Sequence, residues 1–269
     1  MTDTTDTSLP LLGPDDPAPV RIVNPGGTAP VLIVCDHASN AVPAALHGLG
    51  LAERDLHRHI AYDIGAAGVT EGLAARLDAP AVLSGYSRLV IDTNRRLDHP
   101  ESIVRIGDGT PIPGNANVTP EEAGRRAEAC FWPYHRRIAA GLAGFAQSGV
   151  RPVIVSVHAF TPVLAGIERP WHIGVLWDED GRIALPLIES LRASTDLAIG
   201  DNEPYSGRLR YGYSIEVHAT EIGLANVLIE MREDQVAGAD GQQRTAGLLA
   251  HMLAPILADP VLYERGEDR

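Results

Sequence analysis

The chain has 269 residues and a formal net charge of −13, and 45% of its residues are apolar. This length and mixture are typical of one large globular α/β domain or of two small ones. The acidic balance argues against attraction to the phosphate backbone of nucleic acid. Two cysteines without a CxxC spacing are too few for a disulfide framework and indicate a reducing compartment.

The first 20 residues are polar, acidic and proline-rich, and they lack the basic and apolar regions of a signal peptide. No stretch of the sequence approaches the roughly 18 consecutive apolar residues that a membrane span needs. We therefore expect a cytoplasmic protein without a membrane partner. It should have a flexible tail over residues 1–20 and a single catalytic domain over residues 21–269.

Strands and helices are expected to alternate along the chain. Short, continuous apolar runs predict buried strands, and apolar residues at helical spacing predict helices. The expected strands cover residues 30–35, 81–83, 89–91, 152–157, 171–177 and 227–231. The expected helices cover residues 53–77, 120–147, 185–194 and 242–257. Thr119 and Pro120 should begin the second helix, and residues 99–120 should form a long surface loop. This order predicts one α/β domain with a mixed, mainly parallel sheet flanked by helices.

Functional side chains follow three of the expected strands. Asp36 and His37 follow the first, His158 follows the fourth, and Glu230 lies near the end of the last. Ligands bind outside the carboxyl ends of the strands in such sheets. Two imidazoles and a carboxylate suit zinc, which takes three protein ligands and keeps one position for water. Glu230 is then predicted to act as the general base. The structural alternative for each histidine alone is a hydrogen-bond partner, and for Glu230 a partner of Arg232.

A second group of polar residues, Arg88, Asn94 and Arg95, flanks the apolar run at 89–91. The planar guanidinium of arginine matches a carboxylate bidentately. A substrate carboxylate site and a basic surface turn are both compatible with this segment.

Three segments resemble zinc carboxypeptidases: the D-x-N-R element at 92–95, the S-x-H element at 156–158 and the E-x-R element at 230–232. The sequence resembles the N-formylglutamate amidohydrolase family more closely, in segments 35–43, 61–66, 87–95, 202–207 and 230–236. This resemblance implies a zinc-carboxypeptidase-like fold and a zinc-dependent hydrolase of a small anionic N-acyl amino acid, such as N-formylglutamate.

The resemblance also suggests roles for individual residues. His37 and His158 would bind the metal, with Asn94 and Arg95 holding the substrate carboxylate and Arg88 assisting at the oxyanion. Asn202, Tyr205 and Arg232 are further candidates for substrate binding. His218 would donate a proton to the leaving amine or contact a carboxylate, the alternative being a polar residue on a partly exposed strand.

The third metal ligand is where the sequence departs from the carboxypeptidase pattern. Zinc carboxypeptidases have a glutamate ligand three residues after their first histidine ligand. In this sequence the residue three positions after His37 is Asn40. We predict that Asp63 supplies the missing carboxylate, and Asn40 and Asp36 are the alternatives. Asp36 is also a candidate for orienting an imidazole. Zinc is preferred on ligand type, with iron and manganese as alternatives.

The sequence leaves two other functions open and disfavours a third. The first is hydrolysis of a different N-acyl amino acid or a small peptide. The second is an inactive small-molecule binding module, which the presence of Asn40 favours. Serine hydrolysis is disfavoured because no G-x-S-x-G motif occurs.

Overall fold

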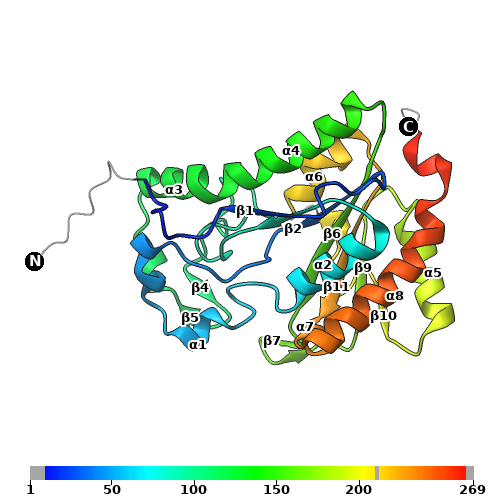
Figure 1. Ribbon diagram of the computed structural model, residues 1–269. Coiled ribbons are helices and arrows are strands. Elements are labelled where there is room, and N and C mark those ends of the chain that lie inside the picture. The colour runs from blue at the N-terminus through cyan, green and yellow to red at the C-terminus, as the bar shows by residue number, and fades with distance from the viewer. Residues whose placement is uncertain (1–9, 210–211, 265–269) are drawn as a thin grey trace, which may run out of the picture.

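The computed structural model describes residues 10–209 and 212–264. A seven-stranded sheet with the order β1-β3-β2-β6-β11-β9-β10 forms the centre of the molecule (Figure 1). Its strands are β1 (Val20–Val23), β2 (Val31–Cys35), β3 (Ala81–Ser84), β6 (Val153–Phe160), β9 (Ile173–Leu176), β10 (Ile199–Asp201) and β11 (Asn226–Arg232). Two small hairpins pair β4 (Ile106–Gly107) with β5 (Thr110–Pro111), and β7 (Val163–Leu164) with β8 (Ile167–Glu168).

Eight α-helices lie among the described residues, several of them a single turn long. They are α1 (Glu53–Leu56), α2 (Ala66–Leu77), α3 (Pro120–Arg126), α4 (Trp132–Gln147), α5 (Ala184–Ser194), α6 (Ser214–His218), α7 (Glu233–Val236) and α8 (Ala239–Leu257). A π-helical turn joins α3 to α4. Thr119 caps α3, because its Oγ1 accepts a hydrogen bond from the Glu122 amide at 3.2 Å.

Strands β3, β2, β6 and β11 are parallel to one another. At one edge β1 pairs antiparallel to β3, and at the other β9 pairs antiparallel to β11 and parallel to β10. The expected α/β domain with one mixed, mainly parallel sheet is confirmed. No helix in the described part of the chain is long and apolar enough to cross a membrane.

Helices cover both faces of the sheet, with α2, α5 and α8 on one face and α4 and α6 on the other (Figure 1). Successive side chains of a strand point to opposite faces. On β6, Val153, Val155 and Val157 therefore pack into the core under α2 and α8, whereas Ile154 packs toward α4. Because both faces are buried, these strands are continuous apolar runs in the sequence.

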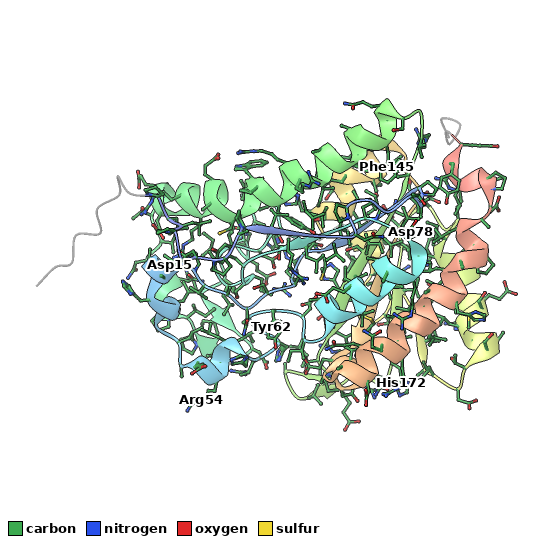
Figure 2. All side chains as sticks on the ribbon, viewed as in Figure 1. Asp15, Arg54, Tyr62, Asp78, Phe145 and His172 are labelled. Carbon is green, nitrogen blue, oxygen red and sulfur yellow. The ribbon has the colours of Figure 1, made fainter. Side chains whose placement is uncertain are left out.

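The single helix expected over residues 53–77 is wrong, because residues 57–65 between α1 and α2 are not helical. Gly65 ends this stretch with a φ of 86°, and a Cβ there would lie 2.1 Å from the carbonyl oxygen of Val236. A glycine is therefore required where the chain turns into α2. The stretch contains Tyr62, labelled in Figure 2, and its neighbour Asp63.

The strand expected over residues 89–91 is also wrong. These residues form a buried turn, in which the Val90 amide donates to the Ser87 carbonyl at 2.9 Å. Their side chains join a second apolar cluster with Ile112 and Phe131. A short apolar run indicates that a segment is buried, but it does not by itself distinguish a strand from a buried turn.

Residues 10–19, expected as part of a flexible tail, lie against the domain. Leu11 is buried, the Tyr86 hydroxyl donates to the Pro17 carbonyl at 2.5 Å, and the Ala44 amide donates to Asp16 at 2.9 Å. The remainder of the expected tail, residues 1–9, lies outside the described residues.

Candidate active site

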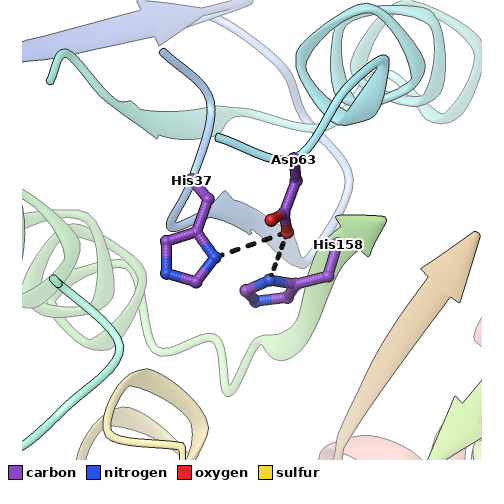
Figure 3. A group of neighbouring side chains, drawn as sticks. All are labelled: His37, Asp63 and His158. Carbon is purple, nitrogen blue, oxygen red and sulfur yellow. Dashed lines mark hydrogen bonds and ion pairs between the residues drawn. The ribbon is translucent and has the colours of Figure 1, made fainter. Parts of the chain in front are cut away.

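Three side chains from separate segments converge at the carboxyl ends of β2 and β6 (Figure 3). His37 lies two residues after β2, Asp63 lies in the turn before α2, and His158 lies within β6, two residues before its end. Asp63 Oδ2 is 2.8 Å from Nδ1 of His158 and 3.4 Å from Nδ1 of His37. One ligand atom from each side chain lies within 4.8 Å of the others, so this buried cluster could hold a metal ion.

Backbone contacts of Asp63 fix its position between the two histidines. Its amide donates to the His37 carbonyl at 3.0 Å, and its Oδ2 accepts from the Ala159 amide at 3.1 Å. The turn at residues 57–65 therefore brings Asp63 onto both strand ends. The structure places Asp63 as the carboxylate of the cluster.

The other ring nitrogen of each histidine contacts a second carboxylate. Nε2 of His37 is 2.7 Å from Asp92, and Nε2 of His158 is 2.9 Å from Asp36. Metal-binding histidines commonly donate their second N–H to a carboxylate, which fixes the ring and its tautomer. The Nδ1 atoms thus face Asp63, where they are positioned to bind a metal.

The alternatives for the third ligand have other partners. Asp36 contacts His158 Nε2 and the Ser214 hydroxyl, as a residue that orients an imidazole would. Asn40 donates to the Leu56 carbonyl at 3.0 Å and contacts His57 at 3.2 Å.

Electrostatic partners shift the titration of these groups. Burial alone would lower the pKa of His158, but Asp36 and Asp63 raise it well above its ordinary value. Burial and the positive charge of Arg88 would lower the pKa of His37, but Asp92 and Asp63 raise it above its ordinary value. Burial would raise the pKa of Asp36, whereas its hydrogen bond to His158 lowers it to about 2. The carboxylates around the two rings therefore favour a positive charge at this position.

Glu230 faces the same space from the neighbouring strand. In the parallel register of β11 and β6 it lies opposite His158. Its Oε2 atom is buried and has no hydrogen-bond partner among the described residues. Burial raises its pKa to about 7, partly offset by the nearby His158. A carboxylate with this pKa can accept and return a proton near neutral pH.

A pocket of about 210 Å³ opens over this cluster. Of the residues predicted for the site, it is lined by His37, Asp63, Arg88, Asn94, Arg95, His158, Tyr205 and Glu230. The guanidinium of Arg88 forms an ion pair with Asp92 at 2.7 Å and lies 3.5 Å from Asp63.

Asn94 lines the pocket, but its side-chain oxygen is used by the backbone. Asn94 Oδ1 accepts hydrogen bonds from the amides of Tyr213 and Ser214, at 2.8 and 3.1 Å. Asn94 therefore fixes the start of α6 against the pocket. Arg95, the other member of the predicted carboxylate pair, lies beside it on the pocket wall and donates to the Asn94 carbonyl at 3.0 Å.

Three predicted site residues do not line the described pocket. His218 is buried in α6, not on a strand, and its Nε2 contacts Nδ1 of His135 at 3.0 Å. Asn202 Oδ1 accepts hydrogen bonds from the backbone amides of Trp177 and Gly207, both at 3.0 Å. It therefore holds the loop that carries Tyr205. Arg232 turns at the end of β11 to Asp234, 2.7 Å away, so the shared strand face does not bring it to Glu230.

Several residues at the site were not predicted from the sequence. Asp92 begins the D-x-N-R element, but that motif does not indicate a contact with His37, and nothing local indicates that Ser214 would contact Asp36. Leu228 and Asn226 also line the pocket, and they alternate with Glu230 along β11. The two-residue period of a strand could have identified this second pair.

Comparisons with known proteins agree with the fold. The family model for N-formylglutamate amidohydrolase matches residues 29–237. A crystal structure of a gene product from Agrobacterium tumefaciens is 32% identical, with a TM-score of 0.89 over 92% of this chain and 98% of that one. The N-formylglutamate amidohydrolase from Ralstonia eutropha is 18% identical and shares the fold, with a TM-score of 0.66 over 90% of this chain and 96% of that one. No curated protein matches the sequence significantly. Because the family model spans most of the chain, including the cluster of His37, Asp63 and His158 and also Glu230, this protein belongs to the N-formylglutamate amidohydrolase family.

Proposed function

We propose that this chain is a zinc-dependent amidohydrolase that cleaves the amide bond of an N-acyl amino acid, such as N-formylglutamate. Membership of the family supports amide hydrolysis. The single observation that carries the proposal is Glu230, a buried carboxylate with an unpartnered oxygen, opposite His158 in the pocket.

The residues present fit a catalytic zinc ion. His37, His158 and Asp63 would hold it through two nitrogens and one oxygen, a donor set that leaves a coordination position open. Asp92 and Asp36 already hold the two rings in place. When bound, zinc would lower the pKa of a water molecule and polarise the scissile carbonyl.

Glu230 performs the proton transfers in this proposal. Its Oε2 accepts the proton of the attacking water and then returns it to the nitrogen of the leaving amino acid. His218 is not needed for this second step, and its position away from the pocket disfavours such a role.

Two arginines supply positive charge on the pocket wall. Arg88, fixed by Asp92, lies beside the metal-binding cluster, where it can stabilise the oxyanion that develops on the carbonyl. Arg95, with Asn94 beside it, is suited to the substrate carboxylate. An inactive binding module loses its main support, because Asp63 supplies the carboxylate that Asn40 lacks.

The test compares metal content and hydrolysis of a panel of N-formyl amino acids, including N-formylglutamate, for wild type and Glu230→Gln. We expect near-stoichiometric zinc in both proteins and about a 10²- to 10⁴-fold loss of kcat in the variant, because the general base is removed. Glu189→Gln, the same change at an exposed site on α5, is the matched control. Full activity in Glu230→Gln, or wild type that binds no zinc when it is supplied, would overturn the proposal.

A further inference from the structure

The pocket continues beyond the metal-binding cluster along strand β11. Glu230, Leu228 and Asn226 alternate along the strand, point to the same face of the sheet and all line the pocket. At about 3.3 Å per residue, this row extends about 13 Å from the general base. The pocket therefore has an arm that is longer than a formyl group requires.

Apolar side chains form the middle of this arm. Leu228 lies opposite Leu176 in the antiparallel register of β11 and β9, and Ile215 of α6 lines the pocket beside them. Beyond them lie Asn226 and Thr220, which are polar and uncharged. An apolar group of a substrate would leave water when it enters this arm, which favours binding.

The side chains in the middle of the arm offer no partner to a second carboxylate. Leu176, Ile215 and Leu228 carry neither a charge nor a side-chain hydrogen-bond donor. A second substrate carboxylate, such as that of a glutamate side chain, would lose its hydration against them without compensation.

The position of the carboxylate site indicates which part of the substrate enters the arm. Asn94 holds the first amides of α6, and the next residue of that helix is Ile215. A substrate carboxylate at Asn94 and Arg95 therefore lies next to the arm. In an amino acid the α-carboxylate and the side chain share one carbon, so the side chain of the released amino acid is the group that reaches Ile215 and Leu228.

From these observations we propose that the enzyme prefers N-acyl amino acids with a large, uncharged side chain, of the leucine, methionine or phenylalanine type, over N-acylglutamate. This inference rests on the proposed function, and it names the amino acid class that the same site selects.

The test measures kcat/KM for N-formylleucine, N-formylmethionine and N-formylglutamate, with wild type and Leu228→Arg. Wild type should favour the leucine and methionine substrates by at least about 10-fold, because a single methylene in a hydrophobic pocket is worth about 10- to 200-fold. Leu228→Arg should lower kcat/KM for N-formylleucine and raise it for N-formylglutamate. Leu185→Arg, at an exposed leucine of α5, controls for the added charge. Equal kcat/KM values, or a preference of wild type for glutamate, would overturn the inference.

A separate binding measurement distinguishes this inference from the proposed function. If the zinc-loaded protein hydrolyses none of the three substrates, the proposed function fails. Calorimetric titration with N-acetylleucine and N-acetylglutamate then decides the preference of the arm. Tighter binding of N-acetylleucine that weakens in Leu228→Arg supports it, whereas equal or reversed affinities reject it.

Discussion

The fold contains two pairs of buried histidines with their rings in contact, and the pKa values of the two pairs shift in opposite directions. The rings of His37 and His158 are 5.0 Å apart and meet edge to face. The rings of His135 and His218 are 5.2 Å apart and stack at an interplanar angle of 17°. The first pair faces the pocket, and the second joins α4, which carries His135, to α6, which carries His218.

The partners of the rings explain the difference. Three carboxylates contact the first pair, whereas His135 donates from Nε2 to the Thr93 carbonyl at 2.9 Å and accepts from His218 at Nδ1. Carboxylates raise the pKa of His37 and His158, while burial lowers the pKa of His135 to about 4 and also lowers that of His218. The first pair is therefore built to carry or bind positive charge, and the second is a neutral structural contact.

The largest effect is expected from a mutation that removes one histidine of the first pair. His158→Ala should abolish stoichiometric zinc binding and hydrolysis, because it removes a metal ligand and leaves Asp36 and Asp63 without their partner. His218→Ala, the equivalent change in the second pair, should retain zinc. Metal analysis of both purified variants is the measurement. Zinc retained in His158→Ala, or lost only in His218→Ala, would reverse our assignment of the two pairs.

A smaller effect is expected when the carboxylate behind a ligand is neutralised. Asp36→Asn should weaken zinc binding by about 10- to 100-fold, because the hydrogen bond that orients His158 loses its charge. Competition with a chelator of known affinity measures the change. Ser214→Ala, which removes the other contact of Asp36, should change zinc affinity less than Asp36→Asn. Unaltered affinity in Asp36→Asn would show that the ring needs no orienting carboxylate.

The smallest expected effect concerns pH and the second pair. Because the folded pKa of His135 is about 4 and its ordinary value is 6.5, the unfolded chain binds a proton that the folded chain does not between these values. The contribution of His135 to the free energy of unfolding should therefore fall by about 2 kcal/mol as the pH falls from 7 to 5.

Urea denaturation of wild type and His135→Gln at both pH values isolates this contribution. The variant keeps a donor for the Thr93 carbonyl and removes the titrating ring. Its free energy of unfolding, relative to that of wild type, should therefore rise by about 2 kcal/mol as the pH falls from 7 to 5. His251→Gln, at an exposed site on α8, is the control. Identical pH dependence in wild type and His135→Gln would mean that the ring does not stay neutral in the folded state.

Much of the fold and part of the site could be predicted from the sequence. Continuous apolar runs marked β2, β6 and β11, because strands buried on both faces need them. The alternation of strands and helices then predicted the parallel sheet, and with it the edge where His37, His158 and Glu230 gather. These features follow from local periodicity and from a general rule of topology.

The sequence alone determined the class of fold, the chemical type of the candidate metal ligands and the family resemblance. Only the tertiary structure decided that Asp92 holds His37 across 55 positions of the chain, that Asn94 fixes α6, and that Arg232 turns away from Glu230. Burial and partners at such distances depend on how loops pack, and no local pattern encodes them. The same dependence separates the two histidine pairs, because the charge of an imidazole is set by what surrounds it in space.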